Sequence, residues 1–138
     1  MAAIIGQGVT LDGIYDTKYD HTFLLAAGIT VADRGKAVAQ DPSAPLQCKL
    51  AGDGDVVIGR LMSVEDRISE GVLVGAVNRK GYARFKYTGA APVVGNSYRG
   101  SATAGSIKAG AAQVAAPAEG RVWDVRLADT TALVDIGM

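Results

Sequence analysis

The chain has 138 residues, of which 49% are hydrophobic, so it is long and apolar enough to bury one core without disulfide or metal cross-links. Its 14 basic and 14 acidic residues give a formal net charge of +0, which excludes the strong overall positive charge of most nucleic-acid-binding proteins. We therefore expect a single domain without a global attraction to polyanions.

The N-terminal stretch "MAAIIGQGVTLDGIYDTKYDH" has neither a basic region nor a continuous apolar core. It does not read as a secretory signal, so we expect the chain to be made in the cytoplasm. The longest apolar run, "FLLAAGITVA", falls far short of the roughly 20 residues that span a bilayer. No membrane anchor is expected.

Residues 1–21 form an expected extended arm rather than a strand or helix. Their apolar side chains are irregularly spaced and interrupted by glycines, a pattern typical of a segment that orders on a partner surface. The apolar and aromatic residues of the arm are Ile4, Ile5, Val9, Leu11, Ile14, Tyr15 and Tyr19. Residues 22–138 are then expected to form one domain.

Strands are expected at 22–31 and 46–50, followed by "DVVIGRLMS". In this last stretch Val57 and Leu61 share one face, while Val56, Ile58 and Met62 share the other with Arg60. That alternation predicts a strand with both faces partly covered.

Next, "GVLVGAVNRKGYARFKY" gives two apolar runs around a basic turn, which predicts a β-hairpin with Asn78–Gly81 at its tip. In its second strand Ala83, Phe85 and Tyr87 alternate with Tyr82, Arg84 and Lys86. A surface that stacks single-stranded nucleic acid needs aromatic rings beside its cations, and here only Tyr82 accompanies them. A half-buried strand with a solvated basic face is the simpler interpretation.

Residues 100–119 are dominated by Ala, Gly and Ser, and either a flexible excursion or tightly packed small-residue strands fit them. Further strands are expected at 120–128 and 131–136. Trp123 shares a period-two face with Val125 and Leu127, which predicts a core position for its ring, with Asp124 and Arg126 opposite. Many short strands between polar turns are typical of an all-β sandwich or small barrel.

The residues that carry chemistry elsewhere form no catalytic or metal-binding pattern here. Asp53 and Asp55 in "GDGD" lack the further ligands of a calcium loop and predict a turn. The one histidine, His21, has no nucleophile motif beside it, and Cys48 alternates with leucines as a small buried residue does.

The carboxylates of "EDRISE", at Glu65, Asp66 and Glu70, are expected to be solvated in a turn, because catalytic carboxylates need burial or close pairing. No phosphate-binding glycine loop occurs in the chain. We therefore expect no enzyme activity, no cofactor and no metal, and we expect binding or assembly instead.

The order of four segments resembles the small decoration, or cement, proteins of tailed-phage capsids, which include relatives of the lambda head-stabilising protein in architecture. The segments are "VVIGRLMSVED" after an acidic glycine turn, "VLVGAVNRKGYARFKY", "VVGNSYRGSATAGSIKAG" and "RVWDVRLADTTALVDI". The resemblance spans about residues 22–138 in layout and rests on glycine placement and apolar alternation. The arm is longer here than in some of those proteins.

The resemblance implies a small β-barrel or β-tulip-like domain, usually a homotrimer, on the outer surface of the expanded phage head. There it clamps neighbouring subunits of the major capsid protein against internal DNA pressure. Trimerisation would multiply weak contacts, and the arm would add a strand to the capsid through its apolar and aromatic residues.

Three alternatives remain open. A nucleic-acid-binding barrel would use the basic strand at 79–87, through Arg79, Lys80, Tyr82, Arg84 and Lys86. A head-fibre base or tail-tube protein would share the same strand pattern. An enzyme or ligand carrier would need a site formed between subunits.

Overall fold

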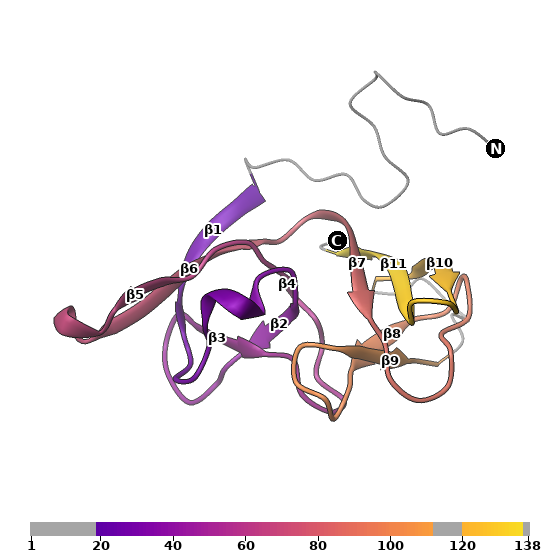
Figure 1. Ribbon diagram of the computed structural model, residues 1–138, viewed down its shortest axis with the longest axis horizontal. Helices are drawn as coiled ribbons and strands as arrows, with labels where there is room; N and C mark the ends of the chain where they lie inside the picture. Colours follow the sequence, from indigo (N-terminus) through magenta and orange to yellow (C-terminus); the bar gives the residue numbers. More distant parts are fainter. Residues whose placement is uncertain (1–18, 112–119, 137–138) are drawn as a thin grey trace, which may run out of the picture.

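The computed structural model describes residues 19–111 and 120–136, and these residues form an all-β fold (Figure 1). The regular elements of the described residues are eleven strands and two short 3-10 helices, η2 (Val31–Asp33) and η3 (Ile68–Glu70). The expected all-β barrel is confirmed. Residues 1–18, 112–119 and 137–138 lie outside the description.

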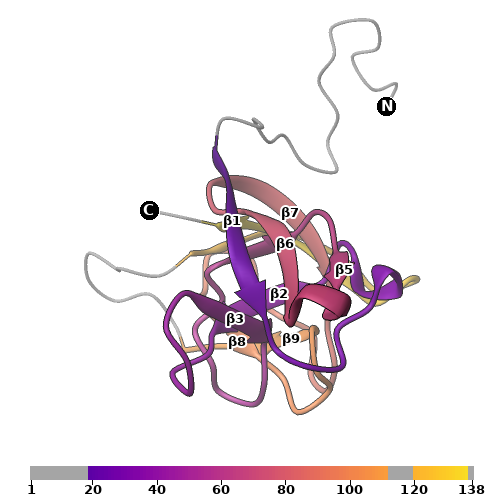
Figure 2. The same cartoon turned by 90° about the vertical axis from the view of Figure 1, so that its left-hand side faces the viewer.

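Five strands close into a barrel. They are β1 (Asp20–Leu25), β2 (Ala37–Gln40), β3 (Gln47–Leu50), β4 (Gly59–Leu61) and β6 (Val72–Asn78), in the order β1-β3-β2-β4-β6. The ring closes because β6 also pairs with β1, beside which it lies in Figure 2. The β1–β3 pair is parallel, and the other barrel pairs are antiparallel. Strand β5 (Glu65–Arg67) is not part of the ring and pairs antiparallel with residues 72–74 of β6.

A second, three-stranded sheet follows the barrel, and we call it the C-terminal sheet. It contains β7 (Gly81–Lys86), β10 (Val122–Arg126) and β11 (Thr131–Ile136), with β11 in the middle. Strands β8 (Tyr98–Gly100) and β9 (Ile107–Ala109) form a separate antiparallel pair, which a bridge between Tyr87 and Ile107 joins to the end of β7.

The predicted hairpin of residues 71–87 is wrong. Both strands exist, but β6 belongs to the barrel and β7 pairs with β11. At its C-terminal end β6 has partners on both sides, because Asn78 pairs with Asp20 of β1 and with Arg60 of β4. No edge of β6 is left there for β7, so the chain passes into the second sheet at Gly81.

Two cores lie on opposite sides of β2. The barrel core fills the ring with Leu25, Ile29, Val38, Cys48, Leu61 and Val77. The sheet core lies between the barrel wall and the C-terminal sheet and contains Ala37, Ala39, Ala51, Val57, Ala83, Phe85, Tyr87, Tyr98, Ile107, Val122, Ala132, Val134 and Ile136. Because side chains alternate along a strand, β2 supplies Val38 to one core and Ala37 and Ala39 to the other.

The closure of the barrel requires a glycine at position 75. Gly75 pairs with Phe23 where β6 meets β1, and a Cβ atom there would collide with the carbonyl oxygen of Ser63 and lie 2.8 Å from Leu25 Cδ1. The backbones at this point are too close for any side chain. Glycine in a strand interior often marks such an approach.

Several expected boundaries change. The first strand begins at Asp20 and ends at Leu25, so Asp20 and His21, expected in the arm, belong to the barrel. The strand at 37–40 was not predicted. Within 100–111, the alternative of small-residue strands is correct, because β8 and β9 pair there and Gly100 is buried.

Candidate protein interaction surfaces

Trp123 is not a core residue as predicted: its side chain is 54% exposed, and that of Leu127 is 70% exposed. The exposure of Trp123 results from a β-bulge, because Val122 pairs with Val134 while Asp124 pairs with Leu133, whereas Leu127 lies beyond the last residue of β10. Trp123 is the extra residue of the bulge. The period-two pattern therefore breaks, Val122 and Val125 face the sheet core, and the indole turns outward.

We use the name outer face for the exposed side of the C-terminal sheet, formed by Tyr82, Arg84, Lys86, Trp123, Asp124 and Asp135. Trp123 and Tyr82 meet edge to face there, with ring centroids 6.2 Å apart and an interplanar angle of 80°. The indole Nε1 donates to Asp135 Oδ2 at 3.2 Å, and the backbone N–H of Arg121 donates to Asp135 Oδ1 at 2.7 Å. The two rings are thus exposed to solvent and held in place.

Arg84 occupies the centre of the outer face and is not a free cation. Its Nη2 lies 2.8 Å from Asp124 Oδ2, its Nη1 donates to Thr131 Oγ1 at 3.2 Å, and its side chain is only 12% exposed. The hydrogen bond from Arg84 is the main reason that the pKa of Asp124 lies below its ordinary value. The predicted alternation of residues 82–87 is confirmed, because Ala83, Phe85 and Tyr87 are all buried.

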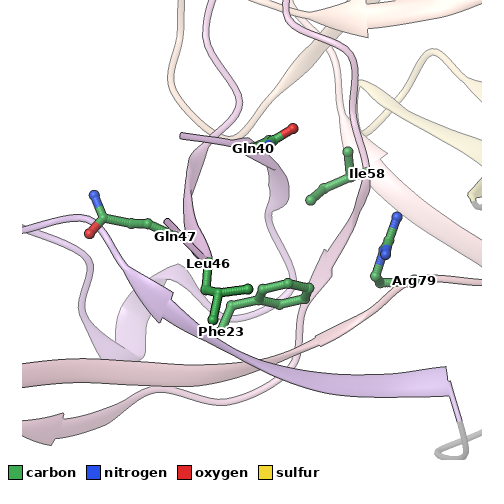
Figure 3. A pocket seen from close by; sticks show the side chains of 6 residues that line it. All are labelled: Phe23, Gln40, Leu46, Gln47, Ile58 and Arg79. Atoms are coloured by element: carbon green, nitrogen blue, oxygen red, sulfur yellow. The ribbon is translucent and has the colours of Figure 1, made fainter. Parts of the chain in front are cut away.

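A second surface is the open end of the barrel, which we call the barrel mouth (Figure 3). It is a cavity of about 230 Å³ lined by Phe23, Gln40, Leu46, Gln47, Ile58 and Arg79. Phe23 stands two residues from Leu25 of the barrel core in β1, and Arg79 directly follows the last residue of β6. Residues two apart in a strand face the same side, so the mouth continues the barrel core toward solvent.

The N-terminal segment joins the barrel at this mouth. The backbone N–H of Arg79 donates to the carbonyl oxygen of Tyr19 at 3.1 Å, and Lys80 Nζ lies 5.1 Å from the centroid of the Tyr19 ring. Tyr19, expected to contact a capsid, therefore contacts its own barrel. The other expected arm residues, Ile4, Ile5, Val9, Leu11, Ile14 and Tyr15, lie outside the described residues.

The carboxylates of "EDRISE" lie on the projecting β5 strand and η3 rather than in a simple turn. Arg67 bridges two of them, with Nε 2.9 Å from Glu65 Oε1 and Nη1 3.5 Å from Glu70 Oε2. The side chains of Glu65, Arg67 and Glu70 are all exposed. A solvated arrangement with a shared cation is a surface ion-pair network, not an acid–base pair.

The structure places the other candidate residues of the sequence analysis in the core, in a turn and on a strand. Cys48 is buried as predicted, and burial raises the pKa of its thiol, which disfavours the nucleophilic thiolate. The "GDGD" turn is confirmed, since Asp55 Oδ2 accepts the Gly52 backbone N–H at 2.8 Å. His21 is an exposed residue of β1.

Among residues 19–111 and 120–136, no three His, Cys, Asp or Glu side chains gather closely enough to hold a metal ion. The same described ranges include no helix with the length and apolar character needed to cross a membrane. Comparison with known proteins finds no matching family model, no matching curated protein and no matching solved structure.

Sequence reasoning missed the outer face because it assumed unbroken alternation in "RVWDVRL". One local signal was present: Val122 and Val125 are three residues apart, and two inward-facing valines at that spacing require one inserted residue. The partner of the indole, Asp135, comes from a different strand and carries no such signal.

Proposed function

We propose that the protein is a structural virion component that binds the outer surface of a phage head as a homotrimer and clamps neighbouring major capsid subunits against internal DNA pressure. The observation that carries this proposal is the exposed Trp123–Tyr82 pair on the outer face, whose indole is hydrogen-bonded to Asp135. The segment order that resembles capsid decoration proteins supports the phage head as the place of binding.

The outer face has the chemistry of a protein-binding surface. Trp, Tyr and Arg are the residues most enriched among those that dominate binding energy at protein interfaces. Here Asp135 fixes the indole and Asp124 fixes Arg84 before any partner arrives. Side chains that are already ordered lose little conformational entropy on binding, so their contacts yield more net affinity.

A clamp needs two separate contact surfaces, and the fold offers them. The barrel and the C-terminal sheet lie toward opposite ends of the long axis of the molecule (Figure 1). One surface can then bind one capsid subunit while the other binds its neighbour or a second copy of this chain. In a homotrimer each weak contact is repeated at high effective concentration, which raises the overall affinity.

The outer face has one feature that favours nucleic-acid binding and one that opposes it. Trp123 joins Tyr82, so the outer face has two aromatic rings instead of one. However, Asp124 neutralises Arg84, and Asp135 lies beside the rings. A stacking surface for single strands needs uncompensated cations next to its rings. We therefore favour a protein partner.

The first test is fractionation of a lysate from phage-infected cells on a density gradient, with this chain quantified by mass spectrometry against the most abundant particle protein. We expect near-stoichiometric migration with full heads, and sedimentation of the purified chain as a trimer. Absence from all particles would overturn the proposal. Migration with tails or fibres alone would replace it with a head-fibre or tail-tube role.

A second test uses variants in a binding assay with expanded heads. Deleting residues 2–18 keeps all of β1, and Trp123→Ala removes the indole from a solvated site. We expect each to weaken binding at least tenfold without a change in melting temperature. Val31→Ala, another exposed apolar residue, is the matched control. Full binding by both variants would contradict the proposed contact surfaces.

A further inference from the structure

Strand β10 forms one edge of the C-terminal sheet. It is the outermost strand, with β11 on its other side (Figure 1). At Val122 the edge is covered, because the Gly95 N–H donates to the Val122 carbonyl oxygen at 2.8 Å and the Val122 N–H donates to the Asn96 carbonyl oxygen at 3.0 Å. From Trp123 to Leu127, no strand of the described residues pairs with this edge.

The backbone groups that line this edge belong to Val125. In an antiparallel pair, residues that bond to the opposite strand alternate with residues that do not. The Asp135 N–H donates to the Arg121 carbonyl oxygen at 3.1 Å, so Asp135 bonds β10. By this alternation Leu133 also bonds β10, whereas Ala132, which lies opposite Val125, does not. The N–H and C=O groups of Val125 therefore point away from β11, toward the edge.

The side chains along this edge are complementary to those of a second copy. If two β10 strands run antiparallel with Val125 opposite Val125, then Asp124 of each copy lies opposite Arg126 of the other. Opposite charges at directly opposed positions stabilise a strand pair. Arg126 is exposed, and Asp124 is 52% exposed although Arg84 bonds its Oδ2. Many edge strands carry charges that repel another strand, but the charges of this edge attract a copy of itself.

Exposed apolar side chains gather at the same edge. Four of the eight large apolar side chains that are exposed among the described residues lie there: Val93, Val94, Trp123 and Leu127. Two of them directly precede Gly95, which bonds the edge at Val122. In the register about Val125, Leu127 of one copy reaches the position opposite Trp123 of the other, beside this loop. Removing these side chains from water favours the association.

We propose that two copies of the chain pair through β10, antiparallel about Val125, so that their three-stranded C-terminal sheets become one continuous sheet. Each Val125 then exchanges two backbone hydrogen bonds with its copy. Directly opposite residues of paired strands share a face, so both outer faces lie on the same side of the joined sheet. The two Trp123–Tyr82 pairs thus belong to one larger surface.

This contact is small and has two-fold symmetry. Residues 123–127 of each copy bury far less than the total of about 1,200–2,000 Å² found in stable complexes, so we expect weak association of the purified protein. A two-fold contact joins copies of neighbouring trimers rather than closing a trimer. Copies held close together on a particle would pair more fully, because their effective concentration is high. The inference concerns two copies of this chain and does not rest on capsid binding.

Mixed disulfide trapping tests the register. Positions 124 and 126 of two copies lie directly opposite, with Cα atoms about 4.5 Å apart, which is within disulfide range. Identical positions lie diagonally, about 7–8 Å apart. Asp124→Cys protein mixed with Arg126→Cys protein should therefore form a disulfide-linked dimer at least tenfold faster than either variant alone. The native Cys48 stays in place because it is buried. Equal rates in the three samples would overturn the proposal.

Charge reversal tests the ion pairs by sedimentation equilibrium. Arg126→Asp places two carboxylates opposite each other and should raise the concentration of half-association at least tenfold. An equimolar mixture of Arg126→Asp and Asp124→Arg should restore association, because each chain then supplies charges of one sign. Lys86→Asp is the matched control, since Lys86 is an exposed cation on β7, away from this edge. No effect of Arg126→Asp would refute the pairing.

The stoichiometry of the unaltered protein separates this inference from the proposed function. Two-fold pairing predicts even-numbered assemblies, either dimers or pairs of trimers, as the protein concentration rises. Trimers alone at the highest concentration would refute the pairing and leave the homotrimer intact. Disulfide trapping in the predicted register, together with absence from phage particles, would support the pairing and overturn the capsid role.

Discussion

The barrel core and the sheet core are built from different side chains. The fully buried residues of the barrel core are aliphatic apart from Cys48, whereas the sheet core holds Phe85, Tyr87 and Tyr98. A ring of five strands leaves room only for side chains of moderate size, so large rings pack where a barrel wall faces a sheet. The barrel core is thus filled by aliphatic side chains, and the large buried rings lie in the sheet core.

The two cores also differ in how far they are closed off from solvent. The barrel core opens into the barrel mouth, where Phe23 is only partly buried. The sheet core is covered by β11 on one side and by β2 on the other. Stability should therefore depend more on the sheet core than on the open end of the barrel, and least on the outer face.

The largest expected effect comes from the two phenylalanines. Phe85→Ala should lower the free energy of unfolding by about 3–5 kcal/mol, because the ring is 1% exposed and its loss leaves a cavity. Phe23→Ala should cost less than about 2 kcal/mol, because that ring borders an open cavity. Urea unfolding measures both. Equal losses of unfolding free energy in the two variants would mean that the two cores contribute equally to stability.

The closure of the barrel is the next most sensitive point. Gly75→Ala should cost about 1–3 kcal/mol, because the new Cβ collides with the Ser63 carbonyl oxygen and strands β1 and β6 must separate. Gly71→Ala is the control, since no atom lies within 4 Å of its Cβ and only its φ of 83° is strained. Thermal unfolding of both variants gives the comparison. A smaller loss for Gly75→Ala than for Gly71→Ala would show that the barrel opens easily.

The polar contact inside the sheet core should matter less. The buried Tyr98 hydroxyl donates to the Asp135 carbonyl oxygen at 2.7 Å, and Tyr98→Phe should cost about 1 kcal/mol. Burial raises the pKa of Tyr98 above its unfolded value near 10. Its contribution is thus complete below about pH 10 and is lost as the pH rises further. Alkaline unfolding should therefore be less steep in Tyr98→Phe; an unchanged profile would exclude Tyr98 as its source.

The smallest effect is expected on the outer face, away from both cores. The hydrogen bond from Arg84 lowers the pKa of Asp124 in the folded protein, so the pair stabilises the fold above the unfolded pKa of about 3.9 and loses this effect as the pH falls through the folded pKa. Since Asp124 is half exposed, Asp124→Asn should cost less than about 1 kcal/mol at pH 7. Acid titration of stability in both proteins measures the difference. A larger cost would assign the outer face a structural role.

Much of the fold follows from local patterns. The alternation in "YARFKY" correctly places Ala83 and Phe85 inside and Lys86 outside, because neighbouring side chains of any strand face opposite ways. The same reasoning puts Val57 and Leu61 on one face of their stretch, and the structure buries both. These predictions need only the existence of a strand. They do not require knowledge of its partner.

Predictions that depended on a partner strand were wrong. The local sequence pattern predicted a hairpin of β6 and β7. In the structure, β1 and β4 pair with β6 on both sides of Asn78, so β7 cannot pair there. Likewise Trp123 was placed in the core by alternation, and its bulge exists only because β10 and β11 fall out of register at Val122. The spacing of Val122 and Val125 was the one local signal of this bulge, and the contact of the indole with Asp135, on a different strand, left no signal in the sequence.

The sequence by itself determined that the protein is all-β, where most turns fall and which residues of most strands are apolar, because these properties depend on neighbours along the chain. The tertiary structure alone decided that five strands close into a barrel, that β2 serves two cores and that Trp123 faces solvent. Strand pairing joins residues far apart in sequence, and each pairing depends on which edges the other strands have left free.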